Sequence, residues 1–297
     1  MATEFRPTTA TRPTPTSVGM SHRTRQSIEV WAIRLVLIAI TLISLFPTVY
    51  VVLYSFKGGG GSLYSSTFIP QKLTLENYTK LFNTNFSYWV RNSVIIGFFS
   101  GAVAVLLASF AGYAFSRMRF RGRKYGILGL LIIQMLPTGL VALPALFRIY
   151  QTVGLLNSIF GLILFFGVGG SALSVWLMKN FMDSIPKELD EAASIDGASH
   201  WQNFWLVLFP LIQPMLVAQF IFGFIGVYNE YIVTTVLLSD PTKYPLGVGV
   251  RTLSAAFATN WTVFCAAAVL GSVPILIIFF MAQRFLVEGL TKGALKG

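Results

Sequence analysis

The sequence predicts an all-α integral membrane protein with six transmembrane helices, and three observations support this fold class. The chain of 297 residues is 55% hydrophobic and only 11% charged, and its mean hydropathy is +0.69. Soluble domains carry about 25% charged residues, so this chain has too few to cover the surface of a soluble globule. The third observation is a set of six long stretches without Asp, Glu, Lys, Arg or His. Together they disfavour a soluble enzyme, a disordered protein and a coiled coil.

Each of the six stretches is long enough for the roughly 20 residues that a helix needs to cross a bilayer. Their sequences are continuously apolar and do not alternate as the strands of a membrane β-barrel do, so we expect helices. The last three stretches are longer than a span requires, and we expect each to include some loop or interfacial helix. The six stretches are 35–56, 92–116, 125–147, 149–178, 201–229 and 252–283.

The distribution of Lys and Arg predicts the orientation of these helices. Six spans place both termini on one side, and a cytoplasmic location of that side puts 15 Lys and Arg inside and 7 outside. Cytoplasmic segments of membrane proteins are enriched in Lys and Arg, so both termini are expected in the cytoplasm. The basic cluster at 117–124 contributes most to this imbalance. The same rule explains the net charge of +11, and we expect no nucleic-acid partner.

The chain divides into five expected segments. Residues 1–28 are rich in Thr, Pro and Arg and predict a disordered cytoplasmic tail. The first transmembrane helix follows at 29–57 and is expected to be retained rather than cleaved as a signal peptide. Residues 58–87 form an external loop that begins with the flexible sequence Gly-Gly-Gly-Gly-Ser at 58–62, which is either natural or an engineered linker. A transmembrane core at 88–284 contains a cytoplasmic loop at 183–210, and 285–297 form a cytoplasmic tail.

Several kinds of functional motif are absent from the sequence. There is no Gly-x-x-x-x-Gly-Lys-Ser/Thr phosphate loop, so we do not expect this chain to hydrolyse ATP by that device. One cysteine, Cys265, and two histidines give no basis for a metal site, and Cys265 is expected to be buried. Ion-coupled carriers usually keep Asp, Glu or His at the membrane midplane, and these spans have none there. The Gly97-x-x-x-Gly101 spacing is interpreted as ordinary close helix packing rather than a specific dimer motif.

The loop at 183–210 predicts two helices joined by a turn. Pro186 suits a first helical position, and acidic residues follow it near the positive end of the helix dipole. Gly197 is placed to end this short helix. Ser199 and Gln202 form a capping-box pattern that begins a second helix, which runs into the fifth span.

One face of the short helix has small and apolar residues beside acidic ones. Leu189, Ala192 and Ala193 share a side at helical spacing, and Glu191 and Asp196 lie next to them. Such a face suits either a docking surface for a partner with basic residues or a solvated connecting helix.

The loop and the C-terminus resemble a known family. Glu191-Ala192-Ala193, three residues, Gly197, nine residues and then Val207-x-Phe209-Pro210 resemble the EAA signature of ABC importer membrane subunits. That signature ends Ile-x-Leu-Pro, so Val and Phe are departures at its two apolar positions. The C-terminal segment is similar to the tail of MalG-like sugar permease subunits, and the likeness rests on Gly289, Leu290, Thr291, Gly293, Lys296 and Gly297.

The resemblance implies the permease fold and composition of a type I ABC importer in the cell (inner) membrane of a bacterium or archaeon. Such an importer has two copies of a cytoplasmic ATPase, an external solute-binding protein and, for the MalG-like kind, a second, MalF-like permease subunit. ATP and Mg²⁺ are then bound by the ATPase, and this chain carries no cofactor and catalyses no reaction. The implied substrate is a sugar, with maltose or maltodextrin as the best choice.

The resemblance also assigns expected roles to particular residues. The helix around the EAA signature docks in the ATPase, the C-terminal residues given above reach between the ATPases, and the loop between spans five and six contacts the binding protein. The docking residues are Leu189, Glu191, Ala192, Ala193, Asp196 and Gly197, the external contact residues are Tyr244, Pro245, Gly247, Gly249 and Arg251, and weaker candidates for the substrate path are Tyr228, Asn229 and Glu230.

Two other classes of function compete with a permease subunit. A stand-alone secondary carrier or facilitator predicts transport by the purified chain without ATP, and the scarcity of midplane charges disfavours its ion-coupled form. A membrane-embedded enzyme requires convergent polar catalytic groups, which the sequence does not offer.

Overall fold

The computed structural model describes residues 22–58, 70, 72–135, 142–256 and 261–294. The chain divides into a unit of residues 1–50 and a unit of residues 51–297, and the first contributes most of one long helix. Over the described residues the prediction of an all-helical chain is confirmed, since the strand pairing there consists of a single bridge between Lys57 and Leu73.

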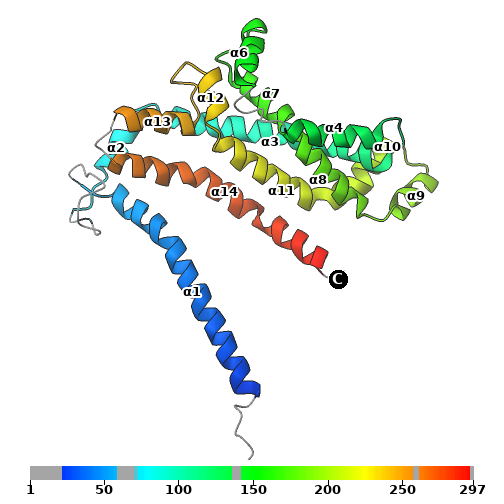
Figure 1. Ribbon diagram of the computed structural model, residues 1–297, viewed down its shortest axis with the longest axis horizontal. Coiled ribbons are helices and arrows are strands. Elements are labelled where there is room, and N and C mark those ends of the chain that lie inside the picture. Colours follow the sequence, from blue (N-terminus) through cyan, green and yellow to red (C-terminus); the bar gives the residue numbers. More distant parts are fainter. Residues whose placement is uncertain (1–21, 59–69, 71, 136–141, 257–260, 295–297) are drawn as a thin grey trace, which may run out of the picture. The chain divides into compact units, whose positions relative to one another are not determined.

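The helices follow one another with short connections. In chain order they are α1 His22–Ser55, α2 Glu76–Phe82, α3 Phe86–Arg117, α4 Arg123–Met135, α6 Leu143–Thr152, α7 Ile159–Gly169, α8 Ser171–Asp183, α9 Glu188–Ile195, α10 His200–Gln202, the π-helix η1 Asn203–Leu208, α11 Phe209–Tyr228, α12 Ile232–Leu237, α13 Leu246–Ala256 and α14 Trp261–Ala294 (Figure 1).

Four helical segments among the described residues are long and apolar enough to cross a membrane. They are Val30–Ser55, Phe86–Arg117, His200–Tyr228 and Trp261–Gln283. A fifth crossing results if α7 and α8, which meet at a bend of 41°, form one broken span. These segments coincide with five of the six predicted stretches.

The predicted third span, 125–147, is not a single helix in the described residues. α4 ends at Met135 after 13 residues, and residues 136–141 lie outside the described part of the chain. Thirteen residues rise about 20 Å, which is less than the ~30 Å hydrocarbon core. The sixth crossing therefore remains a prediction.

α3 is the helix on which the second unit is built. It packs against α7, α8, α11 and α13. At Gly97 and Gly101 the α3 backbone approaches α11 so closely that an added Cβ would lie 2.9 Å from the Phe224 ring and 3.2 Å from the Phe220 ring. The interpretation of this glycine pair as ordinary helix packing is confirmed. The close contact joins two helices of the same chain, α3 and α11. Cys265 is buried, as expected.

Apolar residues cluster near each end of the α3 helix. One cluster joins α3, α8, η1 and α11, and a second joins α2, α3, α11, α13 and α14. α9 and α10 lie at one end of this helix bundle, and α2 and α13 lie toward the other (Figure 1). The expected docking segment and the expected external contact loop are therefore far apart on the bundle. The first cluster consists of Ala108, Tyr113, Val175, Met178, Met182, Phe204, Leu208 and Ile212.

Candidate functional site

The short helix α9 begins two residues later than the sequence suggested. Its N-cap is Lys187, whose carbonyl accepts the amide protons of Asp190 and Glu191, so Pro186 precedes the helix and is not its first residue. The placement of Pro186 at the first helical position was therefore wrong. The acidic residues still lie in the first turn, where the helix dipole favours negative charge.

The end of α9 has the turn chemistry that the sequence predicted. Gly197 adopts φ = +82°, and its amide donates to Ser194 O. Ala198 N donates to Ala193 O, which completes a Schellman motif. Ser199 caps the following helix: its hydroxyl accepts from Gln202 N, and Gln202 Oε1 accepts from Ser199 N. Both predictions are confirmed.

α9 presents an exposed apolar surface flanked by acids. Ile195 is 87% exposed and Leu189 is 42% exposed, although both are large aliphatic side chains. Glu191, Ala192 and Asp196 are also exposed, and Gly197 is exposed in the turn. Ala193 is half-buried, so it contributes less to this surface than its neighbours do.

Ile195 was missed by the sequence reasoning. Its spacing of three from Ala192 is the signal that could have placed it on the same helical face.

The segment after α9 contains a π-helix that the sequence did not predict. Asn203–Leu208 has π geometry and leads directly into α11. Single π turns in longer helices are frequent at functional sites. Aromatic rings surround this segment: Trp201 stacks on Phe110, with centroids 5.9 Å apart, and Trp205 packs on Phe209.

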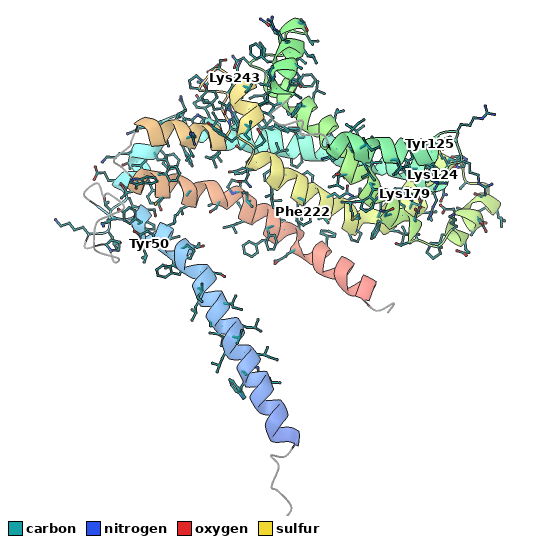
Figure 2. All side chains as sticks on the ribbon, viewed as in Figure 1. Tyr50, Lys124, Tyr125, Lys179, Phe222 and Lys243 are labelled. Carbon is teal, nitrogen blue, oxygen red and sulfur yellow. The ribbon has the colours of Figure 1, made fainter. Side chains whose placement is uncertain are left out.

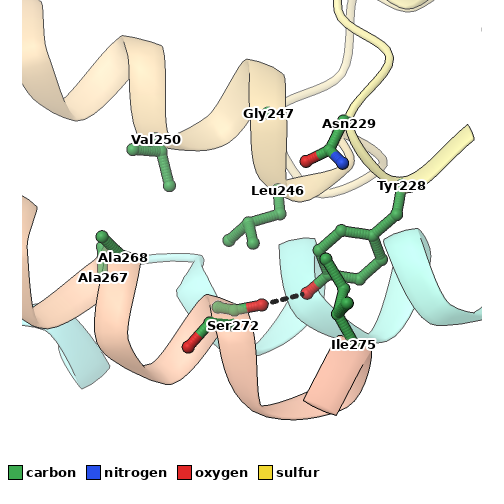
Figure 3. A pocket seen from close by; sticks show the side chains of 10 residues that line it. Tyr228, Asn229, Leu246, Gly247, Val250, Ala267, Ala268, Ser272 and Ile275 are labelled. Carbon is green, nitrogen blue, oxygen red and sulfur yellow. Dashed lines mark hydrogen bonds between the residues drawn. The ribbon is translucent and has the colours of Figure 1, made fainter. Parts of the chain in front are cut away.

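Tyr228 and Asn229, two of the three predicted path residues, line a cavity of about 300 Å³ at the opposite end of α11 (Figure 3). The buried Tyr228 hydroxyl donates to Gly271 O on α14 at 2.8 Å. The other lining residues are Leu246, Gly247, Val250, Ala267, Ala268, Gly271, Ser272 and Ile275.

Glu230, the third predicted path residue, has a structural role. Its carboxylate accepts hydrogen bonds from Val233 N at 2.8 Å, from Thr234 N at 3.2 Å and from the Thr234 hydroxyl at 2.7 Å. These bonds satisfy amide groups at the start of α12 that no helical carbonyl reaches. The structure therefore does not place the Glu230 side chain among the residues lining the cavity.

The predicted external contact residues occupy different environments. Arg251 is exposed, Tyr244 is half-buried, and Gly247 lines the cavity. Pro245 and Gly249 are buried, and a Cβ added at Gly249 would lie 2.1 Å from the Trp89 ring.

The C-terminal residues continue α14 instead of forming a separate segment. Gly289, Leu290, Thr291 and Gly293 belong to this helix, which is described to Ala294. Lys296 and Gly297 lie outside the described residues. Among the described residues, no group of three or more His, Cys, Asp or Glu side chains is arranged to hold a metal ion.

Comparison with known proteins gives consistent matches along almost the whole chain. A family described as "Binding-protein-dependent transport system inner membrane component" matches residues 104–292. The galactooligosaccharides transport system permease protein GanQ of Bacillus subtilis (strain 168) is 37% identical, covering 93% of this chain and 98% of GanQ. The maltodextrin permease protein MalD of Streptococcus pneumoniae is 35% identical, with coverages of 95% and 99%. The maltose/maltodextrin permease protein MalG of Vibrio vulnificus is 37% identical, with coverages of 91% and 96%.

Solved structures show the same relationship. A chain from the crystal structure of a bacterial ABC transporter involved in the import of the acidic polysaccharide alginate is similar with a TM-score of 0.75 and 25% identity. The match covers 90% of this chain and 99% of that chain. This chain therefore belongs to the family of binding-protein-dependent transport system inner membrane components, as an ABC importer permease subunit of the MalG-like sugar permease group that spans the cell membrane several times.

Proposed function

We propose that this chain is the non-catalytic permease subunit of an ATP-driven importer of maltose or maltodextrin, coupled to a separate ATPase through the loop at 183–210. The observation that carries the coupling proposal is the exposed surface of α9. Ile195 and Leu189 are exposed on a helix that ends in a Schellman turn and whose first turn is acidic.

An exposed apolar surface rimmed by acids favours a protein partner over plain solvation. Isolated exposed apolar residues are ordinary, but here Ile195, Leu189 and Ala192 share one small helix with Glu191 and Asp196. An apolar centre with a charged rim is the usual anatomy of a protein interface. We propose that Glu191 and Asp196 pair with basic residues of the ATPase while the apolar residues enter a cleft.

We propose six membrane crossings with both termini and α9 in the cytoplasm. Lys124 and Lys179 lie at the end of the bundle near α9, whereas Lys243 lies beside α6 and α12 (Figure 2). The excess of Lys and Arg in the segments on the α9 side supports this orientation. In this topology 58–87 and the α12–α13 region face outward, and the loop at 183–210 and the tail at 285–297 face inward.

We propose the partners of this subunit from the family to which it belongs and from its relatives. The importer would contain two copies of an ATPase that bind ATP and Mg²⁺, a second, MalF-like permease and an external solute-binding protein. The family to which the chain belongs is described as a component of binding-protein-dependent transport systems, which supports a delivery protein. The ATPases would be contacted by the C-terminal end of α14, and the binding protein by exposed residues near Arg251.

The substrate proposal rests on the names of the relatives and on one cavity. MalD and MalG are named for maltodextrin and maltose, and GanQ for galactooligosaccharides, at nearly equal identity. A galactooligosaccharide is therefore the second candidate. Tyr228 and Asn229 line a cavity of about 300 Å³ that would form part of the path. Membership of the importer family disfavours the stand-alone carrier.

The docking proposal is tested by changing Ile195→Arg. Since this side chain is 87% exposed, the fold should be retained. The ATPase subunit should no longer co-purify with the variant, because a charge replaces an apolar contact at the interface. The matched control is Leu73→Arg, another exposed aliphatic residue, which should retain the ATPase. Normal co-purification with the Ile195→Arg variant would overturn the docking surface.

A further inference from the structure

Arg117 and Asp190 form a largely buried ion pair between α3 and α9. Arg117 is the last residue of α3, and Asp190 lies in the first turn of α9. Arg117 Nε lies 2.7 Å from Asp190 Oδ2, and the two side chains are only 7% and 16% exposed. The carboxyl end of a helix favours a cation and the amino end favours an anion, so both helix dipoles support this pair.

Hydrogen bonds made by other atoms of Arg117 and Asp190 connect the ion pair to two other segments. Arg117 Nη2 donates to Ile185 O at 2.9 Å in the turn that precedes α9, and Nη1 donates to Ser116 Oγ at 3.3 Å. The second carboxylate oxygen of Asp190 accepts from Asn203 Nδ2 at 2.8 Å, and Asn203 is a buried residue of η1. We call Arg117, Asp190 and Asn203 the polar clamp.

The polar clamp holds α9 in place, since α9 has no buried apolar side chain that could do so. No residue of α9 is buried, and its largest aliphatic side chains point away from the bundle. The helices around the clamp are different, since Tyr113, Met182, Phe204 and their neighbours form a buried cluster. Breaking a buried ion pair by removing one partner is strongly destabilising, whereas an exposed pair contributes little. The clamp therefore fixes the position of α9 on an otherwise rigid end of the bundle.

We infer that Arg117, Asp190 and Asn203 are positioning residues that transmit the movement of α9 to two membrane helices at once. α9 is connected to α11 through the chain by way of η1, and the Arg117–Asp190 pair connects it to α3 as well. Because α3 packs against α7, α8 and α11, a displacement of its end reaches the core of the subunit. This inference rests on the proposed docking of α9 to the ATPase.

The test uses the complete importer in vesicles and measures labelled sugar transported per ATP hydrolysed. Arg117→Gln and Asp190→Asn should each lower this ratio about tenfold, a typical coupling effect. The double variant should lose no more than either single variant, because both remove the same interaction. Arg117→Lys should recover part of the ratio, since an ammonium group can still pair with Asp190. The matched control is Arg119→Gln, which removes an exposed arginine of the same basic cluster and should leave the ratio unchanged.

Co-purification of the ATPase separates failure of the clamp from failure of the docking proposal. The ATPase should remain bound to Arg117→Gln and Arg117→Lys but not to Ile195→Arg. A normal transport ratio in the clamp variants, additive losses in the double variant, or release of the ATPase from both Arg117 variants would overturn the clamp. Absence of the ATPase from the wild-type preparation would instead overturn the docking proposal on which the clamp depends.

Discussion

Gly249 lies where the α13 backbone meets the ring of Trp89, and no side chain fits between them. The ring is itself held in place, because Trp89 Nε1 donates to Pro241 O at 2.8 Å. An added Cβ would lie 2.1 Å from Trp89 Cδ2, and the atoms it meets belong to a rigid ring. We predict that Gly249→Ala lowers the free energy of unfolding by about 1–3 kcal/mol, the usual cost of overpacking.

Thermal unfolding in detergent measures this loss. Gly226→Ala is the control, since no atom lies within 4 Å of the added Cβ at that position in α11. This control should not lower the free energy of unfolding and should raise it by about 0.5–1 kcal/mol, the usual gain when Ala replaces Gly inside a helix. Equal effects of the two substitutions would contradict the close contact with Trp89.

Asp240 gives the loop between α12 and α13 a predictable dependence on pH. Hydrogen bonds from the Thr242 hydroxyl at 2.7 Å and from Thr242 N at 2.9 Å hold the pKa of the Asp240 carboxyl below its ordinary value. A lowered folded-state pKa contributes stability above the unfolded pKa of about 3.9, and this contribution is lost as the pH falls through the folded pKa.

The measurement is the difference in melting temperature between the wild-type chain and Asp240→Asn as the pH is lowered. We expect the wild-type chain to be more stable at neutral pH and the difference to shrink below about pH 4. A difference that stays constant down to acidic pH would contradict a charged Asp240 in this loop.

Single residues were predictable from the sequence where their role is local. Gly197 and Ser199 were identified because turn and capping rules depend only on near neighbours. Glu230 was given a place on the substrate path, yet its carboxylate caps α12. Arg117 was counted only as a cytoplasmic charge, because its partner Asp190 lies far along the chain and no local rule connects them.

At the scale of an element, the stability of α9 should depend on the left-handed residue that ends it. Gly197 has φ = +82°, a conformation that costs residues with a Cβ about 1–2 kcal/mol. We predict that Gly197→Ala increases the rate of hydrogen exchange in α9, and that Gly197→Asn does so less, since Asn tolerates this conformation better. Gly154→Ala, at φ = +71° in another loop, should leave exchange in α9 unchanged. Unchanged exchange in the Gly197→Ala variant would show that the Schellman turn does not hold the helix.

The sequence predicted which helices exist better than it predicted where they are interrupted. Long uncharged stretches identified α1, α3, α11 and α14, because the bilayer dictates both length and composition. The same criterion joined residues 125–147 into one span, whereas α4 ends at Met135 and α6 starts at Leu143. It also did not reveal the break between α7 and α8 or the π-helix η1, because these depend on how the helix packs rather than on how apolar it is.

At the scale of the whole molecule, the proposed orientation places α9 and the α12–α13 loop on opposite sides of the membrane. In a Cys265→Ala background, Arg121→Cys, an exposed position of the basic cluster on the α9 side and outside the proposed docking surface, should react with a membrane-impermeant maleimide only after cells are opened. Ser239→Cys, an exposed position after α12, should react in intact cells. Both variants should react in lysed cells, which controls for accessibility. The reverse pattern in intact cells would contradict the orientation.

The fold class of the whole molecule followed from composition, but its long-range contacts did not. Asn77, for example, joins three segments: its amide donates to Ser55 O and Lys57 O, and its Oδ1 accepts from the Thr262 hydroxyl. These partners are distant in sequence, and a polar residue in a segment predicted to be a loop gives no sign of them. The cavity beside Tyr228 likewise exists only because α11, α13 and α14 meet there.

The central claim is that this chain moves sugar only when an ATPase acts on it through α9. The most direct measurement is uptake of labelled maltotriose into vesicles that contain the chain with its co-purifying partners, with and without ATP. The account predicts uptake that requires both the partners and ATP and that is lost in the Ile195→Arg variant, with a labelled galactooligosaccharide as the alternative substrate. Uptake by the chain alone, or ATP-dependent uptake that persists in the Ile195→Arg variant, would contradict it.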